Sequence, residues 1–339
     1  MKKALYSLLA TSILSSILVG CGAPRNAPNT AAFRAPAQFQ ARNAARPARF
    51  GAFASKAGKL RIATYNVRNM FDGVRDNPNY PDERAKPSRE YEALSESIHK
   101  IDADVIGFQE IESKQVLTAF RDKYLSDMGY KEVVLIEGND RRGIDVAVFS
   151  RYPISNVQSH KEARFDVPGQ GVMGFGRDLL QVQIKPSANY QFTMFVGHLK
   201  SQHGGAQADV RRLAEATKAQ EIINNFQQSN PRENVVVLGD FNDQVDTREI
   251  APLVKGTNTV DVIGKDMGKG SHVYTYHPKK YRSRIDYILL NKNMMNEYIS
   301  NSVKLYKPYK NEQGWQDLSY YNASDHIPVT IDLNISQDR

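Results

Sequence analysis

The sequence predicts an α/β domain, and three observations support this class. Segments 60–67 and 103–111 are apolar and rich in β-prone residues, which is typical of strands. Each precedes a stretch with helical spacing of apolar residues, 89–101 and 116–128, and alternation of strands and helices is the pattern of an α/β domain. Residues 235–238 are four consecutive apolar residues, three of them β-branched, which indicates a strand covered on both faces.

The middle of the chain is dominated by consecutive strands. Strands are expected at 130–137, 144–150, 179–185 and 190–200. Runs of this kind usually pair antiparallel. Two further helices are expected at 208–226 and 247–254, one on each side of the apolar strand. The domain should therefore combine strand–helix alternation with antiparallel strands.

Net charge is concentrated in the first 57 residues. The chain of 339 residues has a formal charge of +8, and residues 1–57 contain eight Lys or Arg and no acid. Residues 58–339 contain 37 basic and 37 acidic side chains and are neutral overall. The net charge of residues 58–339 therefore does not predict a general attraction to nucleic acid or membranes, and it leaves a local basic groove as an alternative.

The N-terminus has the features of an export signal. Lys2 and Lys3 precede an apolar run, 4–19, that is short for a membrane span and ends in Leu-Val-Gly-Cys. This ending resembles the lipobox of bacterial lipoproteins, so we expect a signal peptide at 1–20 and a lipid on Cys21. The protein would be exported and anchored to the cell envelope, at the outer membrane or the cell surface. A secretory peptide with an incidental cysteine is the alternative, and a single cysteine allows no disulfide within a monomer.

Residues 21–57 are rich in Ala, Arg and Pro and have no apolar periodicity. We expect a disordered basic tether that joins the anchor to an ordered domain at 58–339. Its charge suits contact with anionic lipid headgroups or cell-wall polymers, and a solvated spacer explains the same composition.

Polar side chains recur where the predicted strands begin or end. After the apolar run, Gly239 lets the backbone turn without a Cβ, and Asp240 and Asn242 can point to the same side of the extended chain. Singly, such residues are ordinary turn residues. Eight of them in series indicate one polar cleft: Asn66, Glu110, His198, Asp240, Asn242, Asp286, Asp325 and His326.

The short motifs around these residues resemble the endonuclease/exonuclease/phosphatase superfamily. They are Thr64-Tyr-Asn66, Phe108-Gln-Glu110, Gly197-His198, Gly239-Asp240-Phe-Asn242, Ile285-Asp286-Tyr and Ser324-Asp325-His326, in the order of the family. The resemblance covers nearly all of 58–339. It implies a four-layer α/β/β/α sandwich with two facing mixed β-sheets, whose strand-end loops form one cleft, and the activity of a divalent-metal phosphoesterase.

The resemblance also implies a metal site. Glu110 is the expected principal ligand, with Asn66 and Asp325 assisting. Hard oxygen ligands suit Mg²⁺, and Mn²⁺ and Ca²⁺ are the alternatives.

Catalytic roles follow from the same resemblance. His326 is the expected general base, and Asp286 would hold its imidazole in the correct tautomer. Asp240 and Asn242 would orient the attacking water and the phosphate. Positioned acid–base groups of this kind each contribute about 10² to 10⁴ in rate.

His198 places the chain with the deoxyribonuclease-, sphingomyelinase- and inositol-phosphatase-like branch rather than with the repair exonucleases. Its expected role is to protonate the leaving oxygen or to bind a phosphate oxygen, with Asp145 as a candidate support. Arg142, Arg177 and Lys200 are candidate phosphate contacts, and solvated surface cations are the alternative interpretation.

Two other segments bear on the substrate. The glycine-rich stretch 168–177 lacks the Gly-Lys-Ser/Thr ending of a nucleotide-binding loop, and we expect a mobile loop there. Tyrosines and lysines are frequent at 274–309, which fits either a surface that stacks bases or a sheet edge protected by lysines.

The expected function is an exported, metal-dependent phosphodiesterase that hydrolyses DNA or RNA. Nucleic acid is the expected substrate partner, the membrane is contacted through the anchor, and no protein partner is evident, so a monomer is expected. The alternatives are a sphingomyelinase-like, inositol-phosphate or other small-molecule phosphoesterase, and a binding module that has lost activity. The complete set of eight polar residues argues against the last.

Overall fold

The computed structural model describes residues 58–74, 84–268, 270, 272–278, 282–307 and 323–336. The predicted signal peptide, Cys21 and the tether lie outside this part of the chain. Within it, no helix is long and apolar enough to cross a membrane.

Two six-stranded sheets form the centre of the domain. The first has the order β13-β14-β1-β2-β4-β3 and the second β11-β12-β10-β9-β8-β5. The first sheet contains β1 (Lys59–Met70), β2 (Val105–Ile111), β3 (Glu132–Leu135), β4 (Asp145–Ser150), β13 (Lys304–Leu305) and β14 (Val329–Asn334). The second contains β5 (Ile154–Gln158), β8 (Leu180–Ile184), β9 (Phe192–His198), β10 (Val235–Asp240), β11 (Thr259–Asp261) and β12 (Asp286–Asn291). Each sheet is mixed, because β1–β2 and β9–β10 are parallel pairs among antiparallel ones.

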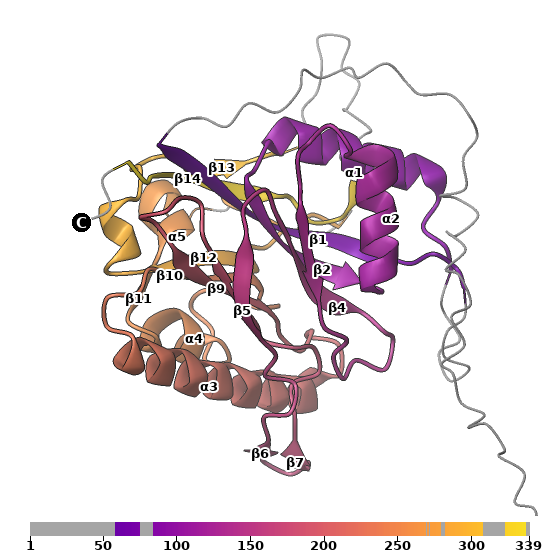
Figure 1. Cartoon of the computed structure of the whole chain (residues 1–339). Coiled ribbons are helices and arrows are strands. Elements are labelled where there is room, and N and C mark those ends of the chain that lie inside the picture. The colour runs from indigo at the N-terminus through magenta and orange to yellow at the C-terminus, as the bar shows by residue number, and fades with distance from the viewer. Residues whose placement is uncertain are drawn as a thin grey trace, which may run out of the picture. The chain divides into compact units, whose positions relative to one another are not determined.

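Helices cover the outer face of each sheet. Helices α1 (Ser88–Ile101) and α2 (Lys114–Tyr124) lie on the first sheet, and α3 (Gly205–Ser229) and α4 (Ala251–Gly256) lie on the second (Figure 1). The order of layers is helix, sheet, sheet, helix. The predicted four-layer sandwich with two facing mixed sheets is therefore confirmed.

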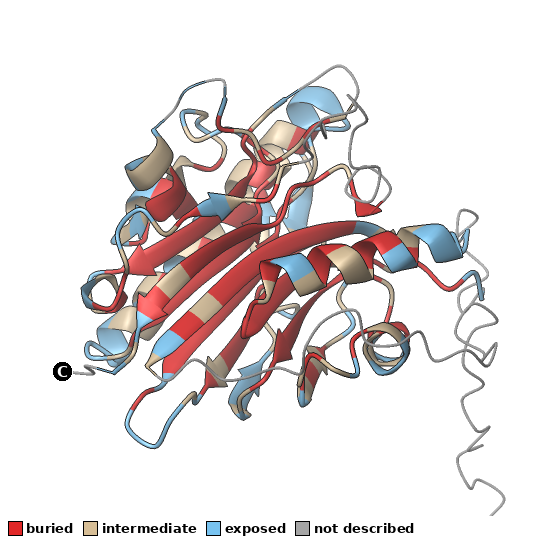
Figure 2. Cartoon of the chain, turned by 90° about the horizontal axis from the view of Figure 1, so that it is seen from above, coloured by how far each residue is buried: buried red, intermediate tan, exposed pale blue. Residues whose placement is uncertain are grey.

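The core between the sheets explains why the strands carry so many apolar residues. Side chains such as Val105 and Val146 of the first sheet and Val196 and Leu238 of the second are fully buried in one cluster. Figure 2 shows the strands buried along most of their length and the helices exposed on their outer faces. Burial of each such side chain contributes about 1.5–3 kcal/mol. Gly107 marks a close approach of the sheets, because a Cβ there would lie 2.3 Å from Leu238 Cδ1.

Some local elements differ from the prediction. The stretch 168–177 contains β7 (Gly171–Met173), which pairs with β6 (Phe165–Val167) in a short hairpin. Strand β5 and the short helices α5 (Val262–Met267) and η1 (Met294–Asn296) were not predicted. Strand β5 lies at a sheet edge and most of its residues are exposed, so no apolar pattern marks it.

Gly239 makes the end of β10 possible. Its φ of +139° is rarely adopted by residues with a side chain, and it pairs with Gly197 of β9. A Cβ at this position would lie 1.9 Å from the carbonyl oxygen of Gly197. The two backbones touch, so neither can shift without moving Asp240 or His198, which are the next residues of the two strands.

We expect Gly239→Ala to destabilise the fold by at least about 2 kcal/mol, since it adds backbone strain to a steric overlap with a neighbouring strand. Gly169→Ala is the matched control, because Gly169 also has a positive φ of +75° but a Cβ there would contact nothing within 4 Å. Its cost should be about 1 kcal/mol of backbone strain alone. Chemical denaturation of both variants measures the difference, and equal losses would show that the contact with Gly197 is unimportant.

Candidate active site

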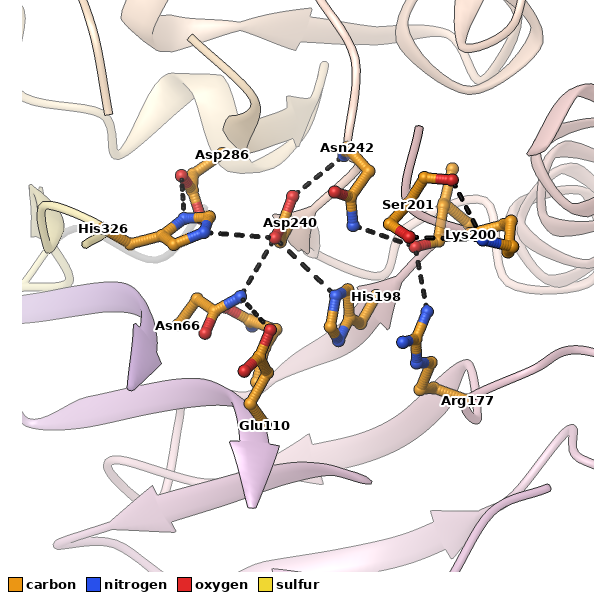
Figure 3. A network of polar contacts seen from close by, with 12 residues as sticks. Asn66, Glu110, Arg177, His198, Lys200, Ser201, Asp240, Asn242, Asp286 and His326 are labelled. Atoms are coloured by element: carbon orange, nitrogen blue, oxygen red, sulfur yellow. Dashed lines mark hydrogen bonds and ion pairs between the residues drawn. The ribbon is translucent and has the colours of Figure 1, made fainter. Parts of the chain in front are cut away.

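The polar side chains predicted at strand ends come together at one edge of the two facing sheets. Asn66 and Glu110 lie toward the ends of the parallel strands β1 and β2. Asp240 is paired with His198 in parallel register and with Asp286 in antiparallel register. Such ends of parallel strands are where α/β proteins form sites. Figure 3 shows these side chains pointing toward one another.

Asp240 lies at the centre of the group. Its Oδ1 accepts a hydrogen bond from the backbone N–H of Asn242 at 2.8 Å, and its Oδ2 accepts one from Asn66 Nδ2 at 3.0 Å. The same Oδ2 is 3.7 Å from His198 Nε2 and 3.6 Å from His326 Nε2. Burial raises the pKa of Asp240 to about 7, although the His326 charge opposes the shift.

His326 is oriented by Asp286. Its Nδ1 lies 2.9 Å from Asp286 Oδ2, and because a carboxylate only accepts, Nδ1 carries the donated hydrogen. Its backbone N–H donates to Ser324 Oγ at 3.0 Å, which in turn donates to the carbonyl of Asn66 at 2.8 Å. Burial lowers the pKa of His326, but the carboxylates of Asp286 and Asp240 outweigh it and raise that pKa to about 10. These carboxylates therefore favour the protonated imidazole.

Glu110 is turned into the cleft by its backbone. It has a positive φ of 66°, at an irregularity in the pairing of β2 with β4. Its Oε1 accepts from Asn66 Nδ2 at 3.2 Å and its Oε2 accepts from the backbone N–H of Asn69 at 2.9 Å. The amide oxygen of Asn66 accepts from the N–H of Arg68 at 3.0 Å. Asn66 therefore presents its amide nitrogen to Glu110 and Asp240, and its role as an oxygen ligand of a metal stays a prediction.

The donor set suits a hard divalent cation. Glu110 and Asp325 offer carboxylate oxygens with free lone pairs, and Asp325 meets Arg68 only at 3.9 Å. Asp240, Asp286 and His326 form a second group, whose ligand atoms lie within 4.8 Å of one another. The Oδ1 of Asp286 is buried and has no hydrogen-bond partner among the described residues. An oxygen of this kind is costly to bury unless a ligand satisfies it, which fits binding of a cation such as Mg²⁺ here.

His198 differs from His326 in its electrostatic surroundings. Burial and the nearby charges of Arg177, His326 and Arg142 all lower its pKa well below the ordinary value, so it is neutral at neutral pH. Its Nδ1 is buried and finds no hydrogen-bond partner in the described part of the chain. A neutral imidazole beside cationic groups is suited to donate a hydrogen bond to an anionic oxygen.

Asp145 does not support His198, and this expectation was wrong. Its Oδ1 accepts a hydrogen bond from the backbone N–H of Gly138 at 2.7 Å. Burial raises its pKa to about 7, and Asp178 and other nearby acids add to the shift. Asp145 therefore acts in the structure of its own loop.

The three predicted phosphate contacts are held in different ways. Arg177 is buried, pairs with Asp140 at 2.8 Å and donates to the carbonyl of Leu199 at 3.4 Å. Arg142 is exposed, and its guanidinium donates to the side-chain oxygen of Asn69. Lys200 Nζ donates to carbonyl groups of its own loop. Arg177 and Arg142 lie close enough to His198 for their charges to lower its pKa, in addition to the effect of burial.

Two buried cations that the sequence did not single out hold the loops of the site. Lys86 Nζ donates to the carbonyl groups of Val67 and Arg68, in the turn after Asn66, at 3.1 and 2.7 Å. Arg212, in the middle of α3, is also fully buried. Charged residues in a loop and a helix are usually solvated, so neither has a signal in the sequence.

Arg212 joins two segments of the site. Its Nη2 lies 2.6 Å from Asp243 Oδ2, and its Nη1 donates to the carbonyl of Lys200 at 3.2 Å. Asp243 directly follows Asn242, and Lys200 is two residues beyond His198. One guanidinium therefore fixes the loops that follow β9 and β10.

Tyr276 is a further site residue that the sequence did not identify. Its ring centre is 4.9 Å from that of His326, with which it forms an isolated β-bridge. Burial raises the pKa of its phenol, and Asp325, Asp240 and Glu110 add to the shift. The residue lies in the Tyr- and Lys-rich segment, whose composition suggested either a surface that stacks bases or a protected sheet edge.

The site brings together an oriented imidazole, amide donors and hard oxygen ligands, which are groups that hydrolysis of a phosphate ester requires. The sequence matches the profile of the Endonuclease/Exonuclease/phosphatase family over residues 61–334. The chain belongs to this family, whose members are typically metal-dependent hydrolases of phosphoesters. No curated protein matches the sequence.

Solved structures share the fold at low sequence identity. Truncated Caenorhabditis elegans TDP2 has a TM-score of 0.56 and 14% identity, covering 81% of this chain and 97% of the other. The human Nocturnin catalytic domain with bound sulfate anion has a TM-score of 0.52 and 17% identity, covering 81% and 94%. Beta toxin 275-280 from Staphylococcus aureus has a TM-score of 0.53 and 19% identity, covering 80% and 99%. At these sequence identities, the similarity shows a shared fold and does not assign a substrate.

We expect His198→Ala to lose about 10²-fold in turnover, by a similar factor on a nucleic acid and on a p-nitrophenyl phosphodiester, because a neutral imidazole stabilises the phosphoryl oxygens of either substrate. Steady-state kinetics on both substrates measures the two factors, with thermal unfolding as a check of the fold. Recovery on the p-nitrophenyl ester alone would instead assign His198 to protonation of the leaving oxygen, since p-nitrophenolate departs without a proton.

Proposed function

We propose that this protein is an exported, Mg²⁺-dependent phosphodiesterase that hydrolyses phosphodiester bonds of DNA or RNA. The observation that carries the proposal is the buried group formed by Asp240, His326, Asp286 and Asn66 beside Glu110. It supplies a carboxylate-oriented imidazole, an amide donor and hard oxygen ligands within one cleft. Family membership supports the reaction class.

Each side chain of the site has a catalytic role that follows from its charge and its hydrogen-bond partners. His326 is held by Asp286 through Nδ1, and its Nε2 lies 3.6 Å from Asp240 Oδ2. After passing its Nε2 proton to the Asp240 carboxylate, the neutral imidazole takes the proton of the attacking water at Nε2. Asp240 and Asn242 orient that water and the phosphate. Neutral His198 donates to a phosphoryl oxygen. A bound divalent cation lowers the pKa of water and neutralises charge on the phosphoryl group.

A polyanionic substrate is favoured by the cations on the His198 side of the cleft. The charges of Arg177 and Arg142 both act on His198, and Arg177 acts also on Lys200. Arg142 precedes β4, Arg177 precedes β8 and Lys200 follows β9, so cationic side chains from three loops lie around His198 and Arg177. A group of cations suits a nucleic-acid strand, whose phosphates recur at short intervals.

The substrate class is tested with the full-length chain in detergent on plasmid DNA, single-stranded DNA, RNA, sphingomyelin and inositol phosphates. We expect turnover of a nucleic acid with Mg²⁺ and none with a chelator. Glu110→Gln keeps the size of the side chain and removes its charge, so its activity should fall by about 10²-fold or more. Glu92→Gln, an exposed residue of α1, is the control and should keep wild-type activity.

Two results would contradict these assignments. Turnover of sphingomyelin or inositol phosphates without cleavage of any nucleic acid would reject the nuclease and support the alternative phosphoesterases. Full Mg²⁺-dependent activity of Glu110→Gln would remove that residue from the metal site. Absence of hydrolysis on every substrate would favour a binding module.

We also propose that the chain is anchored to the cell envelope by a lipid on Cys21, on the basis of the lipobox-like sequence before it. Cys21→Ser should then lose lipid labelling and leave the membrane fraction or accumulate unprocessed, because acyl chains provide most of the affinity for the bilayer. Metabolic labelling with a fatty acid and fractionation of cells measure both. Unchanged labelling and fractionation of the variant would reject the anchor.

A further inference from the structure

A pair of cations shares one aromatic ring next to the active site. The guanidinium carbon of Arg282 lies 4.9 Å from the ring centre of Tyr274, and Lys307 Nζ lies 4.4 Å from the same centre. Cations near an aromatic face are stabilised by the ring, by about 0.5–1 kcal/mol at exposed sites. The ring therefore holds two positive side chains from distant parts of the sequence in one place.

No carboxylate of the described residues neutralises the positive charge of this cluster. Within the described ranges, neither Arg282 nor Lys307 forms an ion pair with a carboxylate. Arg282 is exposed, and Lys307 is partly buried and donates to the carbonyl of His272. Burial and the charge of Arg282 both lower the pKa of Lys307, which indicates that the two cations repel each other. An anion bound beside them would relieve this repulsion.

The cluster lies close to the reacting centre. Tyr276 forms a β-bridge with Ser283, the residue after Arg282, and a second bridge with His326. Tyr274 is two residues before Tyr276, and its ring centre is 6.5 Å from that of His277, the residue after Tyr276. Figure 3 places Arg177 and Lys200 on the His198 side of Asp240, away from His326. The Tyr274 cluster is linked through Tyr276 to His326 instead.

We propose that Tyr274, Arg282 and Lys307 form a second phosphate-binding subsite, which holds a phosphate of a nucleic-acid strand adjacent to the one being cleaved. The inference rests on the proposed nuclease function and specifies how the site distinguishes a strand from a single phosphodiester. With cations beside His198 and others linked through Tyr276 to His326, a strand is held at more than one phosphate. A phospholipid or a monomeric diester has no second phosphate and gains nothing from the subsite.

The test compares the wild-type full-length chain with Arg282→Gln, Lys307→Gln and the double variant. Each is assayed on a single-stranded oligonucleotide and on a p-nitrophenyl phosphodiester. For the double variant we expect kcat/KM on the oligonucleotide to fall at least about tenfold more than on the small ester, because charge-assisted contacts to one phosphate are lost. The salt dependence of oligonucleotide affinity should also weaken, by about 0.7 in slope for one phosphate contact.

Lys304→Gln is the matched control. Lys304 is an exposed lysine whose Nζ lies 4.5 Å from the ring centre of Tyr306, so it has the same kind of ring contact outside the proposed subsite. Neither its kcat/KM ratio between the two substrates nor its salt slope should change. If the kcat/KM ratio between the two substrates changed in Lys304→Gln as strongly as in the double variant, the effect would be one of general surface charge, and the subsite would be overturned.

The remaining outcomes separate the subsite from the nuclease proposal. The wild-type chain could cleave the oligonucleotide while the double variant keeps the same kcat/KM ratio between the two substrates and the same salt dependence of oligonucleotide affinity. This result would overturn the subsite and leave the proposed nuclease function intact. Equal losses on the two substrates would assign Arg282 and Lys307 to the shape of the catalytic centre instead. A wild-type chain that neither binds nor cleaves the oligonucleotide, yet hydrolyses the small ester, would overturn both proposals.

Discussion

The buried carboxylate of Asp240 is the interaction on which the rest of the site depends. Taking a carboxylate out of water costs several kcal/mol unless donors replace the lost hydration. Here the donors come from both halves of the sandwich, since Asn66 belongs to the first sheet and Asn242 follows a strand of the second. The two sheets are therefore joined at this edge by a polar contact whose loss would leave an unpaired buried charge. The apolar core holds the sheets together, and Asp240 fixes how their ends face each other.

Two histidines that lie at similar distances from this carboxylate differ in their pKa values. His198 and His326 approach Asp240 Oδ2 at nearly equal distances, 3.7 and 3.6 Å. The carboxylates of Asp286 and Asp240 raise the pKa of His326 in spite of its burial, whereas burial and neighbouring cations lower the pKa of His198. The pKa values of identical side chains are thus shifted in opposite directions by their neighbours, which is how one site can provide both an acid–base group and a neutral donor.

Sequence patterns predicted the parts of the structure that depend on local regularity. The strands that bear the site were found because both faces are buried and each ends in a polar residue, as in the run before Asp240. The contact between His326 and Asp286 followed from a family resemblance and is present at 2.9 Å. The orientation of Asn66 could not be predicted, because it is decided by the N–H of Arg68 in a turn with positive φ.

Other features escaped prediction because they depend on partners distant in the sequence. Asp145 was associated with His198 through the family resemblance, but in the structure its Oδ1 accepts a hydrogen bond from a backbone N–H seven residues earlier. Tyr276 belongs to the site through pairing with a segment 50 residues later. Sequence spacing carries no information about such pairings unless the strands themselves are regular, and residues 273–277 form only isolated bridges.

Arg212 shows how far the site extends into the scaffold. It lies in α3, on the outer side of the second sheet, and yet its guanidinium holds both the Asp243 carboxylate and the Lys200 carbonyl. A random screen for loss of phosphoesterase activity should therefore recover substitutions in a helix that contacts no reacting group. Catalytic defects and folding defects would be hard to tell apart at such a position by activity alone. More residues should therefore affect activity when they are substituted than take part in the reaction.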